Sequence, residues 1–241
     1  MTVIIIAILI GLSLGLFGSG GSILTVPALV YVLGYTPKIA VHMSLAVVSL
    51  MSLMAVLPYW LRRQVPWRLT LQLAVPGAVG ALVGSFLSQY LSEFWQMTVL
   101  AVLMGLAATN MWRRELVRIE LKRASAFMAV GAGIGLLTGL VGVGGGFMLV
   151  PVLVAVTALE MSSVMGISLS LVLLQSVVGY VSHQLLQPIP LNYTTIAWLG
   201  GLGAVGSLAG LVLLPKLPQL LLRRGFSVFL AGLAALVMLR H

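Results

Sequence analysis

The chain has 241 residues, of which 61% are hydrophobic and only 7% are charged. Soluble domains carry about 25% charged residues, and the mean hydropathy of +1.17 extends along the whole length instead of marking one anchor. This composition excludes a soluble globular protein and predicts an all-α polytopic membrane protein. At ~20 residues per span, the length allows about eight to ten hydrophobic segments.

The charged residues are strongly unbalanced. There are 13 Lys and Arg against 4 acids, and the net charge is +9. The basic residues form short clusters between apolar runs, which is typical of the positive-inside bias of membrane proteins, so we exclude a nucleic-acid partner. The chain has no Cys, which excludes disulfides and thiolate metal sites, and we predict neither a metal site nor a cofactor.

Ten apolar segments are separated by polar residues or glycines. Five of them approach 20 residues, the length that crosses a hydrocarbon core of ~30 Å, whereas 22–34 and 146–159 are too short. The first two segments of each half either both cross or form a re-entrant hairpin. The segments are 2–18, 22–34, 39–61, 69–91, 94–112, 124–141, 146–159, 161–182, 196–214 and 225–239.

The chain also repeats itself. An offset of 124 residues carries Gly11, Gly15, Gly18, Gly20, Gly21 and Pro27 onto Gly135, Gly139, Gly142, Gly144, Gly145 and Pro151. An offset of 126 carries Gly77, Gly80 and Gly84 onto Gly203, Gly206 and Gly210. These matches predict two transmembrane repeats of five segments each, residues 1–123 and 124–241, as in many secondary transporters.

The basic links predict that these are inverted-topology repeats. The link 62–68 holds three arginines, and its counterpart 183–195 holds no Lys or Arg. The link 89–93 holds no Lys or Arg, and its counterpart 215–224 holds three basic residues. The basic side therefore changes between the halves, and the five basic residues of 113–123 fit a cytoplasmic linker. We expect both termini outside.

Two glycine runs are the strongest local signal. Each follows an apolar segment, and each is followed by a proline six residues after its last paired glycine, at Pro27 and Pro151. A glycine run breaks a membrane helix, which is tolerated only where protein or a watery cavity covers the backbone. The two runs read Gly18-Ser19-Gly20-Gly21-Ser22 and Gly142-Val143-Gly144-Gly145-Gly146.

In inverted repeats the two runs would approach from opposite faces and meet near the midplane. The short helices that follow would point their free N–H groups at one spot, which predicts an anion site built from backbone. The alternative is that glycines only allow helices to pack closely. We prefer packing for the isolated pairs Gly11/Gly15 and Gly135/Gly139, and the anion site for the two runs.

With these runs and prolines, the motifs Ala40-Val41-His42-Met43-Ser44-Leu45 and Val164-Met165-Gly166-Ile167-Ser168-Leu169 resemble the TauE/SafE family of membrane anion transporters, also called the sulfite exporter or TSUP family. The resemblance covers essentially the whole chain. It implies transport of small sulfur-containing anions such as sulfite, thiosulfate or sulfoacetate. The family usually has Gly-Thr where this chain has His42 and Met43.

Three side chains near these motifs are further candidates. The hydroxyls of Ser44 and Ser168 are suited to donate to anion oxygens, although serines in membrane helices often bind their own i−4 carbonyl instead. His42 is a titratable group close to the motif, and we expect it to tune pH dependence. The alternative for His42 is a neutral, hydrogen-bonded histidine near the outer interface.

These features predict a secondary transporter or facilitator, not an enzyme, in the cell membrane, which is the inner membrane in a Gram-negative bacterium. The partners would be the anion and the lipid bilayer, and the oligomeric state stays open. The absence of Asp argues against a cation pathway, and anion efflux gains ~2.3 kcal/mol per charge per 100 mV. The alternative is an intramembrane serine protease that pairs Ser19 or Ser22 with His42 or His183. Because the second run has Val143 and Gly146 in place of the serines, we prefer the transporter.

Overall fold

The computed structural model describes residues 2–18, 20–112, 124–141, 149–150, 153, 159–213 and 219–240. The described chain folds into helices, which agree with nine of the predicted segments; the segment 146–159 lies largely outside the described residues. The helices are α1 (Thr2–Phe17), α2 (Gly20–Pro27), a π-helical continuation η1 (Ala28–Val32), α3 (Pro37–Leu61), α4 (Trp67–Ser88), α5 (Glu93–Trp112), α6 (Ala124–Val141), α8 (Met161–Leu186), α9 (Tyr193–Leu213) and α10 (Gln219–Arg240).

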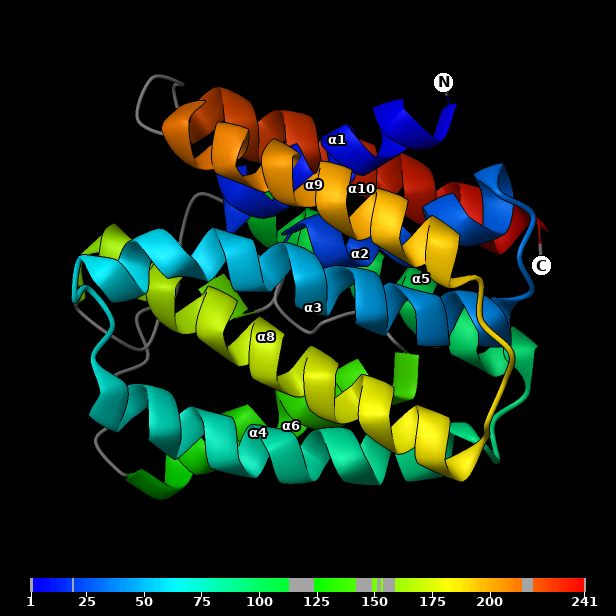
Figure 1. The fold of residues 1–241 in the computed structure, drawn as a ribbon, viewed down its shortest axis with the longest axis horizontal. Helices are drawn as coiled ribbons and strands as arrows, with labels where there is room; N and C mark the ends of the chain where they lie inside the picture. Colours follow the sequence, from blue (N-terminus) through cyan, green and yellow to red (C-terminus); the bar gives the residue numbers. More distant parts are fainter. Residues whose placement is uncertain are drawn as a thin grey trace.

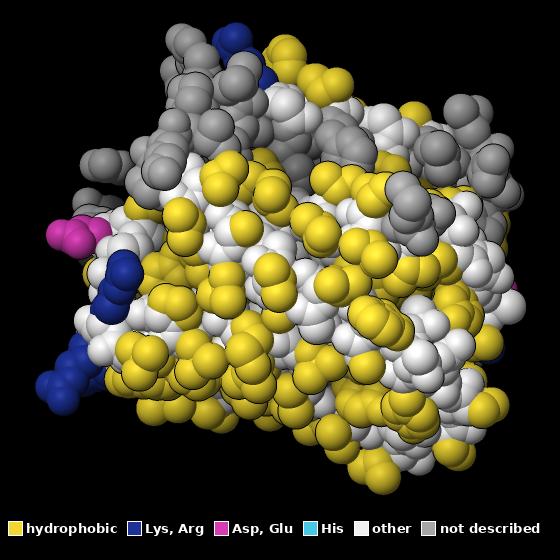
Figure 2. Space-filling model, turned by 45° about the horizontal axis from the view of Figure 1, so that its top comes forward, with side chains coloured by type: hydrophobic (Ala, Val, Ile, Leu, Met, Phe, Trp, Pro, Cys, Tyr) yellow, Lys and Arg dark blue, Asp and Glu magenta, His cyan; other side chains and the backbone are white. Residues whose placement is uncertain are grey.

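Four of the described helices, α3, α4, α8 and α9, are long and apolar enough to cross a membrane. The outer side of α4 illustrates the surface, because its exposed residues recur every three or four positions and are large and apolar: Leu71, Val75, Val79, Leu82 and Phe86. In Figure 2, hydrophobic side chains are spread over the described part of the face in view, and Lys and Arg side chains lie at its edges. Such an extensive apolar surface is suited to a lipid environment.

Helices α3 and α8 form the centre of the molecule. The share of their apolar spans that is buried is 72% and 67%, against 44% for α4 and for α9. The two central helices run in opposite directions (Figure 1). His42 near the start of α3 lies beside His183 near the end of α8, and Trp60 near the end of α3 donates its indole N–H to the Ser170 hydroxyl at 2.9 Å.

The largest helix contacts join the two halves of the chain. Helix α1 packs along α9, α4 along α6, α3 along α8 and α5 along α10 (Figure 1). The first helix of each half thus packs on the fourth helix of the other half. The halves are therefore interleaved, and neither forms a separate packed unit.

Glycines bring the α1–α9 and α4–α6 pairs into backbone contact. A β-carbon on Gly11 would overlap the carbonyl oxygen of Gly203, and a β-carbon on Gly135 would overlap that of Gly77. The offsets found in the sequence make these two contacts equivalent. The interpretation of Gly11 and Gly135 as packing positions is confirmed, because close backbone approach is how small residues hold membrane helices together.

Candidate functional site

The first glycine run breaks the chain between α1 and α2, as the sequence predicts. Gly18 follows α1 with φ +70°, in the left-handed region that favours glycine, and it is buried. Its carbonyl oxygen accepts a hydrogen bond from the Ser168 hydroxyl at 3.3 Å. A β-carbon on Gly18 would overlap the Met165 sulfur. The structure therefore brings the first run against the serine motif of the other half.

The structure describes only some of the other candidate residues in the two glycine runs. Gly20, Gly21 and Ser22 form the first turn of α2. The predicted meeting of the two runs involves residues outside the described part of the chain, namely Ser19, Gly142, Gly144, Gly145 and Gly146.

Ser44 is fully buried, as Ser168 is. Its neighbour Leu45 packs against Gly179, where an added β-carbon would lie 3.3 Å from the leucine side chain. Gly179 follows Ser168 by eleven residues on α8, which is about 16 Å along the helix. The described residues therefore do not bring Ser44 and Ser168 into one site.

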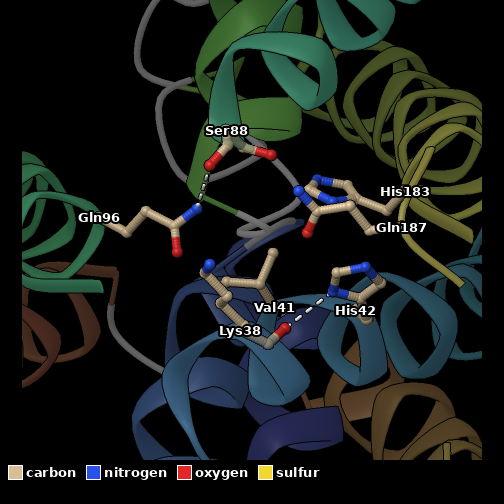
Figure 3. A pocket seen from close by; sticks show the side chains of 7 residues that line it. All are labelled: Lys38, Val41, His42, Ser88, Gln96, His183 and Gln187. Carbon is tan, nitrogen blue, oxygen red and sulfur yellow. Dashed lines mark hydrogen bonds between the residues drawn. The ribbon is translucent and has the colours of Figure 1, made fainter. Parts of the chain in front are cut away.

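A second group of polar side chains lines a pocket where α3 and α5 begin and α4 and α8 end (Figure 3). The pocket contains about 190 Å³ of empty space, its open mouth included, and it is too narrow for a water molecule, so side chains must move apart to admit a ligand. We call it the histidine pocket. Its lining residues are Lys38, Val41, His42, Ser88, Gln96, His183 and Gln187.

The two imidazoles of the histidine pocket come from opposite halves of the chain. Their rings pack edge to face, with centroids 4.6 Å apart. His42 Nδ1 donates to the Lys38 carbonyl oxygen at 2.8 Å, and His183 Nε2 donates to the Gly139 carbonyl oxygen at 2.8 Å. His42 is thus hydrogen-bonded near a helix start, as its alternative interpretation expects.

Sequence reasoning did not group His183 and Gln96 with His42. Gln96 and His183 are 54 and 141 residues from His42 in the chain, and no motif connects them. Both histidines also lie far from the glycine break, because His183 follows Ser168 by fifteen residues, about 22 Å along α8. This separation argues against a serine–histidine pair at the first glycine run. Among the described residues, no three His, Cys, Asp or Glu side chains are grouped so that they could hold a metal ion.

A stripe of buried polar side chains on α8 connects these two regions. Its members follow Ser168 by seven, eight, fourteen and fifteen residues, so they share one side of the helix. Gln175 accepts a hydrogen bond from the Thr138 hydroxyl at 3.2 Å, but its amide nitrogen has no partner within the described structure, and neither has the hydroxyl of Ser176. The stripe consists of Ser168, Gln175, Ser176, Ser182 and His183.

Comparison with known proteins agrees with a membrane function. The sequence profile of the family described as "Sulfite exporter TauE/SafE" matches residues 3–239. A "Probable membrane transporter protein" of Xylella fastidiosa is 30% identical over 250 residues, which cover 96% of this chain and 92% of the relative. A protein of the same description from Bacillus subtilis is 24% identical over 83% of this chain and 87% of its own length. A third, from Methanocaldococcus jannaschii, is 26% identical over 75% of this chain and 70% of its own length.

No solved structure matches the chain. The family profile covers nearly the whole sequence, and four of the described helices are long and apolar enough to span a membrane. The chain belongs to the TauE/SafE sulfite exporter family and is a membrane transporter.

Proposed function

We propose that this transporter is a secondary transporter or facilitator that exports a small sulfur-containing anion across the cell membrane. The substrate class is sulfite, thiosulfate, sulfoacetate or a similar compound, as the family description suggests. In a Gram-negative bacterium the location would be the inner membrane. The membrane potential favours export, because each negative charge leaving a negative interior gains ~2.3 kcal/mol per 100 mV.

The observation that carries the proposal is the polar stripe on α8. It begins at Ser168, beside the glycine break, and ends at His183 in the histidine pocket, about 22 Å further along the helix. Buried polar side chains are costly in a membrane helix and commonly mark a substrate pathway. Two of them, Gln175 and Ser176, keep polar atoms without a partner among the described residues. These atoms are suited to contact an anion that passes along α8.

The glycine runs are proposed as a backbone-built part of this pathway. The break after Gly18 leaves the first N–H groups of α2 outside any helical hydrogen bond, and such groups bind anions. The repeat offset carries Gly18 onto Gly142 and Ser44 onto Ser168. The second run is therefore proposed to contribute to the same pathway.

The proposed orientation rests on inverted repeats. Two observations support them: the third helices of the halves, α3 and α8, run antiparallel, and equivalent glycine pairs join α1 to α9 and α6 to α4. With the arginine-rich link 62–68 on the cytoplasmic side, the opposite end of α3 faces outward. The histidine pocket would then open on the outer face.

Transport into proteoliposomes tests the proposal. Purified protein is reconstituted, potentials of either sign are imposed, and the movement of sulfite, thiosulfate, sulfoacetate and sulfate is followed. We expect sulfur-anion transport that accelerates when the potential drives anions across. Potential-independent or absent transport of the whole panel would contradict the proposal.

Variants of the α8 stripe test the pathway itself. Ser176→Ala and Gln175→Leu should slow transport by about tenfold or more, since each removes a polar group that would contact the anion. The matched control is Ser52→Ala on α3, because Ser52 is also fully buried but donates to its own helix, to the Val48 carbonyl at 2.6 Å. That control should transport at the wild-type rate.

A further inference from the structure

Two buried atoms that line the histidine pocket lack a hydrogen-bond partner among the described residues. They are Nε2 of His42 and Oε1 of Gln96, in side chains that are 2% and 3% exposed. The second polar atom of each side chain is already engaged. His42 Nδ1 donates to the Lys38 carbonyl at 2.8 Å, and Gln96 Nε2 donates to the Ser88 carbonyl at 3.2 Å.

These two hydrogen bonds determine whether His42 Nε2 and Gln96 Oε1 can donate or accept a hydrogen bond. A carbonyl oxygen only accepts, so His42 Nδ1 carries a proton, and in the neutral ring Nε2 is a lone pair. Oε1 of Gln96 is an acceptor in any case. The histidine pocket therefore presents two buried acceptors without a donor, a state that binding of a proton-bearing group would relieve.

The same pocket also carries positive charge. Figure 3 shows Lys38 and Gln96 on one side of the narrow pocket, and His42, His183 and Gln187 on the other. The Lys38 ammonium supplies one positive charge. Since the two imidazoles are 4.6 Å apart, their mutual repulsion disfavours a positive charge on both at once.

Among the described residues, no carboxylate lines the histidine pocket. Its titratable groups come from α3, with Lys38 and His42, and from α8, with His183. Helix α5 contributes the Gln96 amide and α4 contributes Ser88. Helix α6 contributes the Gly139 carbonyl that holds His183. Glu93 lies three residues before Gln96 on α5 but is not among the lining residues.

We propose that the histidine pocket binds one small oxyanion together with one proton, so that sulfite is held as hydrogen sulfite. The Lys38 ammonium attracts the anionic oxygens. The proton lies either on the ligand, whose O–H donates to His42 Nε2 or Gln96 Oε1, or on His42, whose Nε2–H donates to the anion. Both forms have the same balance of one anion and one proton from solution. The inference rests on the proposed function and specifies the form in which the anion binds.

The residues at the opposite end of α3 and α8 differ from those of the histidine pocket. The repeat offset carries His42 onto Gly166 and Tyr59 onto His183. At the end of α3 and α8 opposite the histidine pocket, a β-carbon on Gly166 would lie 3.2 Å from the Tyr59 β-carbon. Packed side chains therefore occupy the space that corresponds to the pocket. A proton-linked anion site is thus present on one face of the transporter, which makes the two faces chemically unequal.

Calorimetry on the purified full-length protein in detergent tests the proposal. Sulfite is titrated in buffers that differ in protonation enthalpy, over a pH range in which the dianion comes to dominate. Where the dianion dominates in solution, we expect the heat to report uptake of one proton per sulfite bound and the affinity to fall about tenfold per pH unit. Thiosulfate distinguishes the two positions of the proton, because it carries no proton near neutral pH. Proton uptake on thiosulfate binding would therefore place the proton on His42.

Two variants and two controls connect the signal to the pocket. Lys38→Gln should weaken sulfite binding tenfold or more, and His42→Gln should abolish proton uptake with thiosulfate while sulfite binding remains measurable. Arg68→Gln removes an equivalent charge from an exposed position at the other end of the molecule, and Ser52→Ala changes a buried hydroxyl outside the pocket. Both controls should bind as wild type.

The outcomes separate this inference from the proposed function. Sulfite binding without proton uptake, equal binding by Lys38→Gln and Arg68→Gln, or no binding of any oxyanion by the wild type overturns the inference. If liposome transport of sulfite persists in that case, the proposed function stands. Proton-linked binding in a protein that transports no sulfur anion would support the pocket and contradict the proposed function. The wild-type measurement decides the point even if a variant fails to fold.

Discussion

The backbone of Gly11 on α1 lies against the carbonyl oxygen of Gly203 on α9, with no space for a β-carbon between them. The repeat-equivalent pair, Gly135 on α6 and Gly77 on α4, has the same arrangement. Each contact joins the first helix of one half to the fourth helix of the other. Because lipid tails compete with apolar side chains for helix surfaces, such close backbone packing is a main source of helix association in a membrane.

Alanine at either first-helix glycine should therefore destabilise the protein. Gly11→Ala and Gly135→Ala force helix pairs apart, and overpacking of this kind costs about 1–3 kcal/mol. Thermal unfolding of the detergent-purified protein, followed by fluorescence or light scattering, measures the loss. The matched controls are Gly133→Ala on α6 and Gly201→Ala on α9, where an added β-carbon meets nothing within 4 Å. A control as damaging as Gly135→Ala would disprove the steric argument.

The break at Gly18 allows a second comparison. Gly18 and Gly34 have nearly the same φ, +70° and +74°, but a β-carbon on Gly18 would overlap Met165, whereas one on Gly34 would meet nothing within 4 Å. Gly34→Ala should lower the stability of the fold only by the ~1–2 kcal/mol that a left-handed backbone costs an alanine. Gly18→Ala should lower it further, because its β-carbon also overlaps Met165. The difference between the melting temperatures of the two variants measures the effect of this overlap, and equal melting temperatures would show that Met165 moves aside at no cost.

The proposed backbone anion site predicts the effect of β-branched side chains. Gly21→Val and Gly145→Val should each abolish transport of sulfite-type anions, because a branched side chain blocks approach of an oxyanion to N–H groups on a pathway that uses both runs. Transport by the monodisperse protein in proteoliposomes measures this, with Gly201→Val as the control, because a β-carbon there meets nothing within 4 Å. A folded Gly145→Val protein that transports at the wild-type rate would leave the glycines as packing positions only.

The inverted topology predicts which positions are accessible from outside. The chain has no cysteine, so single cysteines can be introduced without background. Cysteine in place of Thr2 or His241 should react with an impermeant reagent in intact cells, and cysteine in place of Arg118 in the central basic link should react only after the membrane is opened. If either terminal cysteine is protected from the reagent in intact cells, the proposed orientation is contradicted.

The sequence alone predicted the elements and their repetition. Apolar runs ended by polar or glycine residues correspond to the described helices to within six residues at either end, since the length and polarity of a membrane helix are local properties of the chain. The helix break after Gly18 and the packing role of Gly11 and Gly135 also followed from local patterns, because a missing side chain determines how closely backbones can approach. The family followed from the same motifs.

Only the tertiary structure decided which helices meet. The sequence offers no signal that α1 packs on α9 and α4 on α6, because contacts between remote helices depend on how whole surfaces fit and not on any local pattern. For the same reason Leu45, next to Ser44, packs against Gly179, which lies about 16 Å along α8 from Ser168. The tertiary structure also assembles the histidine pocket from His42, Gln96 and His183, which are distant in the chain and lie together only because α3 and α8 run antiparallel beside the start of α5.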